Sequence, residues 1–335
     1  MSSYSTINNH QTTVPSLPVT HTTSQTAAAL GWSRLPAAYA IPSIAPTIEE
    51  ARKYCARLAR SHYENFSVAS WFLPRRLRQH FFNVYAYCRI SDDLGDEVGD
   101  TTAALALLDQ WQSELNACYK GTPRHPVFVA LAETVRQFDI PQQEFSDLLT
   151  AFRQDQTVTR FETFDDVLGY CHYSANPVGH LVLYLCGYRD KERQDLSDFT
   201  CTALQLANFW QDVSRDYEKG RIYLPLEDMR RFGVGQDDIA HNRNTPAFRA
   251  MMQFEVERAR HWFRQGLPLI EKVDHELAID LDLFSRGGLE ILNSIQDQNY
   301  AVLGKRPAIS KSRKIALVAH AALAKLFGRP GGGLQ

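Results

Sequence analysis

Residues 85–96 read YAYCRISDDLGD, and this stretch places polar side chains along one face of a helix. Four of them stand at i, i+4, i+7 and i+11, a spacing that aligns side chains on an α-helix: Tyr85, Arg89, Asp92 and Asp96. Like charges four residues apart repel each other by about a few tenths of a kcal/mol. The stretch therefore needs a compensating contact, and the candidates are a solvated face, a salt-bridge cluster and a divalent cation.

A second stretch, QLANFWQDVSRD at residues 205–216, has a similar spacing. Two amides and two aspartates stand at i, i+3, i+7 and i+11: Gln205, Asn208, Asp212 and Asp216. If the two helices face each other, their side chains form a ring of hard oxygen ligands, which Mg²⁺ prefers and shares with substrate phosphates. One such motif alone is more often a solvated face, but two motifs together favour a metal site.

The histidines exclude two other helical proteins that are rich in carboxylates. A di-iron bundle needs Glu-x-x-His pairs, and none of the eleven histidines has a glutamate three residues before it. An HD-type phosphohydrolase needs a His that is followed directly by an Asp, and none of the eleven histidines is followed by Asp. Magnesium therefore stays the expected metal.

The hydrophobic pattern is helical from Thr47 onward, without long strand-like alternation or a Gly-rich phosphate loop. Thr47 and Glu50 form a capping signature, and Gly121 is a helix-stop glycine. The sequence predicts helices over 47–63, 74–93, 101–120, 123–138, 141–154, 164–188, 194–217, 246–265 and 276–303, and after Ser310. We expect one all-α domain over residues 46–328 and a flexible tail over 329–335.

The first 45 residues differ in composition from the rest of the chain. They are rich in Ser, Thr, Pro and Ala, contain no acidic residue, and include Arg34 as their single Lys or Arg. Such a segment cannot bury enough apolar surface to order itself, so we expect a disordered arm over residues 1–45. A transit peptide is a second interpretation, although it normally carries more arginine.

Charge and cysteine usage restrict the partners and the compartment. The formal net charge is −2, which gives no basic excess, so we expect no nucleic-acid partner. The six cysteines form no CxxC pair and no signal-peptide pattern precedes them, which predicts buried thiols in a cytoplasmic protein.

No apolar run reaches the roughly 20 residues that a membrane span needs. The most apolar helix begins near Ile315 and follows three basic residues: Lys311, Arg313 and Lys314. Two interpretations stay open, a final packing helix and a basic amphipathic helix that rests on the inner face of an anionic membrane.

Two further stretches accompany the acidic helices. YCHYSANPVGHLVL, residues 170–183, should kink at Asn176-Pro177 and Gly179 and leave room beside an apolar cavity. In YEKGRIYLP, Gly220 ends a helix, and Arg221 follows it where its guanidinium can reach a phosphate.

Four motifs in this order resemble the squalene/phytoene synthase family: YAYCRISDDLGD, YCHYSANPVG, QLANFWQDVSRD and GRIYLP. The resemblance covers about Ala51 to Arg313. It implies an isoprenoid synthase fold, a single helical domain around a central apolar cavity with aspartates at its mouth. It also implies Mg²⁺ as the cofactor and a prenyl diphosphate as the substrate.

The resemblance also implies a role for individual residues. The metal ligands it implies are Asp92, Asp96, Asn208, Asp212 and Asp216, with Asp93 as an additional candidate. The catalytic residues it implies are Tyr85 and Tyr170 beside the carbocation and Arg89 on the diphosphate. The substrate-binding residues it implies are His62, Tyr63, Phe66, Gln205, Arg221 and Tyr223.

Within the family, HYENFSVASWFLP at residues 62–74 is most similar to bacterial hydroxysqualene synthases of hopanoid pathways. The implied reaction ionises presqualene diphosphate, handed over by a presqualene diphosphate synthase, and lets water capture the rearranged cation. One alternative is head-to-head condensation of two prenyl diphosphates, with NADPH needed if squalene is the product. Another is a non-catalytic relative that serves as an assembly factor, although such relatives should lose metal aspartates.

The sequence departs from the broader family at three places. Tyr63 stands where serine is usual, and Asn176-Pro177 replaces the glycine of the common V-A-G stretch. Gly288 stands where carotenoid-forming members often have tyrosine. These departures suit an enzyme specialised for the second half of the family's reaction.

Overall fold

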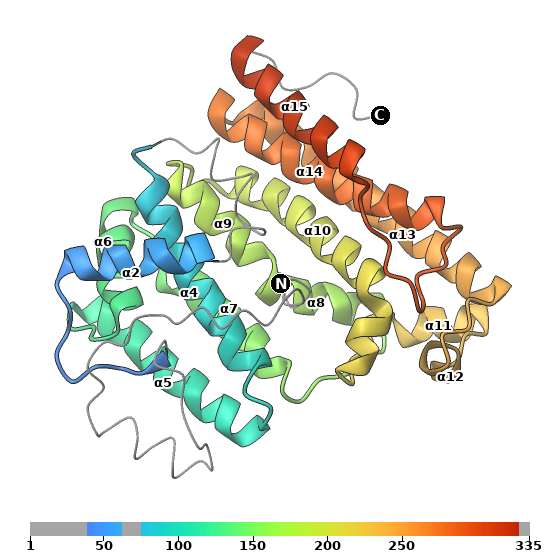
Figure 1. Cartoon of the computed structure of the whole chain (residues 1–335), viewed down its shortest axis with the longest axis horizontal. Helices are drawn as coiled ribbons and strands as arrows, with labels where there is room; N and C mark the ends of the chain where they lie inside the picture. The colour runs from blue at the N-terminus through green and yellow to red at the C-terminus, as the bar shows by residue number, and fades with distance from the viewer. Residues whose placement is uncertain (1–38, 62–74, 328–335) are drawn as a thin grey trace. The chain divides into compact units, whose positions relative to one another are not determined.

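The computed structural model describes residues 39–61 and 75–327 of the 335-residue chain. These residues are mainly helical and contain no β-strand, and a single parallel bridge joins Arg160 to Ile222. The predicted all-α class is therefore confirmed. The helices group into two compact units, which are described one at a time below (Figure 1).

The first unit comprises the chain up to Thr157 together with residues 184–187. Its helices are α2 (Ile48–Ser61), α4 (Arg78–Asp96), α5 (Thr101–Lys120), α6 (Pro126–Phe138) and α7 (Gln142–Gln154). Helix α4 packs against all four of the others, so it is the central element of this unit (Figure 1).

Buried hydrogen bonds fix the rotation of α4 about its axis. The Tyr87 hydroxyl donates to the carbonyl of Phe145 on α7 at 2.7 Å. The indole N–H of Trp111 on α5 donates to the Ser91 hydroxyl at 2.9 Å. Positions 87 and 91 lie roughly opposite Tyr85, Arg89 and Asp92 on the helix. The face that carries Tyr85, Arg89, Asp92 and Asp96, called the acidic stripe of α4 from here on, therefore points away from α5 and α7.

The second unit comprises residues 158–183 and 188–335. Its helices include α8 (Phe164–Ser174), most of α9 (Asn176–Leu185), α10 (Lys191–Glu218), α11 (Leu226–Phe232) and α12 (Gln236–Ala240). They continue with α13 (Pro246–Gly266), the 3₁₀ helix η3 (Leu267–Lys272), α14 (His275–Asp297) and α15 (Lys311–Phe327). Helix α10 is central here and packs against α8, α13, α14 and η3 (Figure 1).

Two glycines let neighbouring helices approach α10 closely. A Cβ atom on Gly179 of α9 would lie 2.2 Å from the Ser197 hydroxyl oxygen on α10. A Cβ atom on Gly288 of α14 would lie 2.3 Å from Phe263 Cζ and 2.8 Å from Leu204 Cδ2. No real Cβ contact is that short, so a larger residue at either position forces its neighbours to move. Gly179 thus allows α9 and α10 to pack closely, and it also lies one turn after the interruption between α8 and α9.

The observed boundaries differ from the sequence-based ones at two places. The helix predicted over 164–188 is two helices, because the backbone breaks at Ala175 (φ −120°, ψ −48°) just before Asn176-Pro177. The helix predicted over 276–303 ends at Asp297, since Asn299 and Tyr300 adopt positive φ angles of 50° and 57°.

Other local predictions are confirmed. Thr47 and Glu50 exchange the reciprocal hydrogen bonds of a capping box, and Gly121 ends α5 in the left-handed conformation at φ 82°. All six cysteines are free thiols, and four of them are buried. No helix in the described part of the chain is long and apolar enough to cross a membrane.

Candidate functional site

The acidic stripe on α4 carries its own counter-charge. The Arg89 guanidinium lies 3.5 Å from an Asp92 carboxylate oxygen and forms a closer ion pair with Asp93. Both aspartates are buried, with 8% and 7% of their surface exposed. A salt-bridge cluster therefore offsets much of the repulsion that the spacing creates.

Tyr39, which precedes α2 in the sequence, also contacts this stripe. The Tyr39 hydroxyl donates a hydrogen bond to the Asp93 carboxylate, and burial beside that negative charge raises the pKa of Tyr39. Asp93 is thus bound by Arg89 and Tyr39 together. Asp92 pairs with the same arginine at the longer distance of 3.5 Å.

Burial makes Asp92 an unusual carboxyl group. Loss of water, followed by the nearby charge of Asp96, raises the pKa of Asp92 to about 7. Burial also raises the pKa of Tyr85 to about 12, although Arg89 opposes the shift. At neutral pH the Tyr85 hydroxyl is protonated and can donate a hydrogen bond, whereas Asp92 ionises fully only when a cation approaches it.

The acidic stripe on α10 takes its closest counter-charge from a distant segment, while Arg215 of the same helix lies 3.8 Å from Asp212. Arg306, in the connection between α14 and α15, forms two ion-pair contacts with the Asp212 carboxylate, one of them at 2.9 Å. The same guanidinium donates to Gln211 at 2.8 Å, and Gln211 donates to the Pro307 carbonyl at 2.7 Å. The side chain of Asp212 has no exposed surface, so Arg306 neutralises a fully buried charge.

Asp216 and Arg221 form the other end of this stripe. The Arg221 amide donates to the Asp216 carbonyl at 2.8 Å, just after Gly220 turns the chain at φ 82°. Burial, followed by the charge of Asp212, raises the pKa of Asp216 to about 7, and Arg221 opposes this shift. The sequence-based placement of Arg221 beside the acidic motif is consistent with this geometry.

An aromatic cluster adjoins the α10 stripe within the same unit. The rings of Phe209 and Tyr223 stack in parallel with centroids 3.8 Å apart. Tyr170 lies 5.5 Å from Tyr223 and 6.0 Å from Phe209, and Phe161 completes the group. Such a wall of ring faces is apolar and can stabilise positive charge.

The predicted site residues fall into two groups, one in each unit. Helix α4 holds Tyr85, Arg89, Asp92, Asp93 and Asp96. The second unit holds Tyr170, Gln205, Asn208, Asp212, Asp216, Arg221 and Tyr223. The remaining predicted residues, His62, Tyr63 and Phe66, lie outside the described residues.

Sequence reasoning missed two residues that contact these groups. Tyr39 stands in the stretch read as a disordered arm, and only its aromatic character within a Ser/Thr/Ala-rich segment marks it. Arg306 is 94 residues from Asp212. No helical spacing links two positions that far apart, so a local pattern could not pair them.

The donor chemistry of both stripes fits Mg²⁺. Every predicted ligand offers oxygen, and Asp92 and Asp216 are carboxyl groups whose pKa is raised mainly by burial. Among the described residues, no three His, Cys, Asp or Glu side chains converge on a metal position by themselves. This is the situation in which Mg²⁺ takes one or two carboxylates and completes its shell with water and substrate phosphates.

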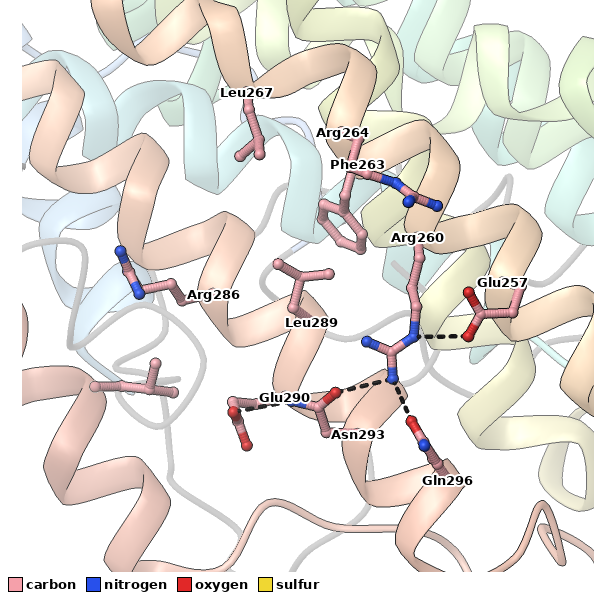
Figure 2. Close-up of a pocket in the computed structure, with 11 residues that line it drawn as sticks. Glu257, Arg260, Phe263, Arg264, Leu267, Arg286, Leu289, Glu290, Asn293 and Gln296 are labelled. Carbon is pink, nitrogen blue, oxygen red and sulfur yellow. Dashed lines mark hydrogen bonds and ion pairs between the residues drawn. The ribbon is translucent and has the colours of Figure 1, made fainter. Parts of the chain in front are cut away.

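A separate pocket of about 540 Å³ lies between α13 and α14, with Leu317 of α15 at its border. In Figure 2, Arg260 of α13 pairs with Glu257 on its own helix at 3.3 Å and donates to Asn293 at 2.9 Å and Gln296 at 2.8 Å on α14. None of the predicted site residues that the structure describes lines this pocket. Arg286, a second arginine of the lining, pairs with Asp282, and we assign no ligand to the pocket.

Comparison with known proteins gives a consistent set of matches. The family model described as squalene/phytoene synthase matches residues 59–313. The 15-cis-phytoene synthase of Synechocystis sp. is 29% identical over 82% of this chain and 86% of its own length. The 15-cis-phytoene synthase of Synechococcus elongatus is 30% identical over 82% of this chain and 92% of its own length.

Two solved structures are similar as well. The crystal structure of squalene synthase HpnC from Alicyclobacillus acidocaldarius is 46% identical and has a TM-score of 0.73, covering 76% of this chain and 95% of that chain. A dehydrosqualene synthase in complex with a ligand is 28% identical with a TM-score of 0.75, covering 84% of this chain and 98% of that chain.

Proposed function

The chain belongs to the squalene/phytoene synthase family, whose members use prenyl diphosphates, and we propose that it converts presqualene diphosphate to hydroxysqualene. The 46% identity to the chain described as squalene synthase HpnC, against 29% and 30% to two phytoene synthases, favours a squalene-type reaction over a phytoene-type one. The observation that carries the narrower choice is the similarity of HYENFSVASWFLP to hydroxysqualene synthases.

In this proposal the residues of both acidic stripes act on one diphosphate. The residues that hold Mg²⁺ are Asp92, Asp96, Asn208, Asp212 and Asp216. Bound there, the metal supplies positive charge at the oxygens of the leaving diphosphate. Asp93 stays a candidate ligand, but Arg89 and Tyr39 bind its carboxylate and favour a positioning role.

Arginines on both stripes complete the diphosphate site. Arg89 lies beside Asp92, and Arg221 is 8% exposed beside Asp216. As the carbon–oxygen bond breaks, its electron pair goes to the diphosphate, and these groups stabilise the charge that develops.

The carbocation left behind needs an apolar wall that excludes stray water. The stacked rings of Phe209 and Tyr223, with Tyr170 beside them, offer such a wall next to the α10 stripe. Tyr85 is the corresponding aromatic residue of the α4 stripe, and its hydroxyl stays protonated because its pKa is about 12. One water oxygen then bonds to the rearranged cation and loses a proton, which gives the alcohol without any reductant.

Head-to-head condensation of two prenyl diphosphates is the second candidate. The matches to 15-cis-phytoene synthases favour it, because those relatives cover more than four fifths of this chain. Both reactions begin with the loss of a diphosphate, so the acidic stripes serve either one. The substrate that is consumed distinguishes them.

The test uses the purified full chain with Mg²⁺ and no NADPH, in ¹⁸O-labelled water. One reaction receives presqualene diphosphate and a parallel one receives farnesyl diphosphate, and mass spectrometry identifies the products. We expect an ¹⁸O-labelled C30 alcohol from presqualene diphosphate and no consumption of farnesyl diphosphate. Conversion of farnesyl diphosphate to presqualene diphosphate or a hydrocarbon would instead assign the condensing reaction.

A further inference from the structure

The positive charge of the chain is concentrated at its C-terminal end. Residues 298–335 contain seven Lys and Arg residues and no Asp or Glu. The rest of the chain contains 29 Lys and Arg against 38 Asp and Glu, so a basic end follows an acidic body. Helix α15 (Lys311–Phe327) lies within this basic end, along the edge of the second unit beside α14 (Figure 1).

The apolar side chains of α15 point outward to an unusual degree. Ile315 is 69% exposed and Leu323 is 54% exposed, which places both among the large apolar side chains most exposed in the described part of the chain. Ala316 and Ala319 are exposed on the same side of the helix. A surface helix normally turns its apolar stripe toward the core, so this stripe faces the wrong way for packing alone.

Polar contacts hold the inner side of the same helix to α14. Arg313 pairs with Asp297 at 2.7 Å, and His320 lies 3.2 Å from Asp282, which is 2% exposed. Leu317 borders the pocket of Figure 2, so apolar packing beneath α15 is incomplete. Ala321 and Ala324 are buried on the inner side as well, so α15 carries apolar side chains on its inner face and on its exposed outer face.

Lysines flank the exposed apolar stripe. Lys311 and Lys314 stand at i and i+3, one turn apart on one flank of α15, and both are exposed. Lys325, at i+14, lies on the same flank. Exposed aliphatic residues bordered by lysines are the pattern of a helix that lies in a membrane interface.

We propose that the outer face of α15 docks on a lipid bilayer with anionic headgroups. The lysine flank lies at the level of the lipid phosphates, and Ile315 and Leu323 enter the boundary between headgroups and acyl chains. Charge complementarity selects this partner over a second copy of the chain, because two copies would bring two basic ends together. The proposal does not depend on which reaction the enzyme performs.

The test measures binding of the full chain to vesicles by flotation, with neutral phosphatidylcholine vesicles and vesicles that also contain phosphatidylglycerol. The first variant is Lys311→Gln/Lys314→Gln. Its matched control is Lys53→Gln/Lys191→Gln, which removes two exposed helix-surface lysines elsewhere. The second variant, Ile315→Gln/Leu323→Gln, has Ile44→Gln/Ile48→Gln as its control, since those isoleucines are exposed outside α15.

We expect the wild-type chain to bind the anionic vesicles, to bind neutral vesicles far more weakly, and to lose binding as salt increases. Each lysine near an anionic surface contributes about fivefold, so the lysine variant should bind about 25-fold more weakly while its control stays within about twofold. The Ile315/Leu323 variant should weaken binding while the Ile44/Ile48 variant does not.

Three outcomes would overturn the proposal. The first is equal binding of the wild-type chain to neutral and anionic vesicles, or no binding to either. The second is an equal loss in the α15 variants and their controls. The third is a wild-type dimer that dissociates in the Ile315/Leu323 variant without any vesicle binding, because this face would then be a contact between copies. Circular dichroism of each variant checks that its helix content is unchanged.

Discussion

The two acidic stripes have a similar spacing but are neutralised in different ways. On α4, Arg89 lies three and four residues before its partners, so the counter-charge is local. On α10, Arg215 of the same helix lies 3.8 Å from Asp212, but the closer partner is Arg306, 94 residues later in the chain. Each stripe thus combines a local arginine with a distant residue, since Tyr39 reaches Asp93 on α4. The main counter-charge is local on α4 and distant on α10.

The two helices are also positioned by different forces. Hydrogen bonds from Tyr87 to α7 and from Trp111 to Ser91 fix α4. Close contacts at Gly179 and Gly288 fix α10. A directional bond tolerates small changes in volume, but a contact that leaves no space for a Cβ atom does not. Changes in volume should therefore harm α10 more than α4.

The largest expected effect comes from removing one carboxylate from either stripe. Asp92→Asn and Asp212→Asn should each lower the rate of diphosphate release about a thousandfold, because each removes charge that the ionisation step requires. A pyrophosphate-release assay measures this. Asp198→Asn is the matched control, since Asp198 is on α10 but pairs with His180 outside the stripe, and it should keep most of the activity.

Full activity in both the Asp92 and the Asp212 variants would refute the metal assignment.

Asp93→Asn tests whether the two neighbouring aspartates of α4 have different roles. Because Arg89 and Tyr39 already bind its carboxylate, this variant should lose much less activity than Asp92→Asn. An equal loss would restore Asp93 to the set of metal ligands.

The next largest effect concerns the distant counter-charge. Arg306→Met leaves Asp212 as a buried charge without its main partner and should lower the free energy of unfolding by about 3 kcal/mol in chemical denaturation. Adding Asp212→Asn should recover most of that loss. Arg89→Met should cost less, because Asp93 keeps its hydrogen bond to Tyr39 and Asp92 can take up a proton near pH 7. Equal losses for the two arginines would contradict this difference.

A smaller effect is expected from two neighbouring glycines on α14. Gly288→Ala places a methyl group against Phe263 and Leu204, which should lower the free energy of unfolding by about 1–3 kcal/mol. Gly287 has open space around its Cβ position, so Gly287→Ala should raise stability by up to about 1 kcal/mol through helix propensity. Thermal unfolding of both variants tests this, and equal changes of the same sign would show that packing at Gly288 is not tight.

The last expected effect is a pH dependence that both stripes share. The pKa of Asp92 and of Asp216 rises from about 4 in an unfolded chain to about 7 in the folded one. Between these values the folded chain holds protons that the unfolded chain has released. The stability of the metal-free protein should therefore fall as pH rises from about 4 to 7, and level off above 7.

Each group contributes at most about 1.4 kcal/mol per pH unit to the fall in the free energy of unfolding. Asp92→Asn and Asp216→Asn should each make the free energy of unfolding depend less steeply on pH. Glu255 and Asp280, whose pKa values burial also raises, should leave a remaining slope in both variants. Urea denaturation across this pH range is the measurement, and an unchanged slope in the variants would contradict the assignment.

The sequence predicted that the α4 residues share one helix, which the structure confirms. The spacing of Arg89, Asp92 and Asp96 lies within three helical turns, so helix geometry alone places them together. The same argument predicted the capping box at Thr47 and the helix stop at Gly121, which the structure confirms. Where one helix holds all the participants, periodicity is sufficient.

Contacts between distant segments were beyond that reasoning. No period connects Tyr39 with Asp93 or Arg306 with Asp212, and only folding brings these side chains together. The break at Ala175 was expected as a kink within one helix, but it divides that helix in two. Proline signals where a helix is interrupted, while the surrounding packing decides whether the chain bends or stops.

We propose that both stripes act on one diphosphate. Calorimetric titration of pyrophosphate with Mg²⁺ at pH 8, where Asp92 and Asp216 are ionised, tests it in the wild type, Asp92→Asn, Asp212→Asn and the double variant. We expect each single variant to lose most of its pyrophosphate binding and the double variant to lose little more, because a shared site fails when either half fails. Losses that add independently, or intact binding in either single variant, would contradict it.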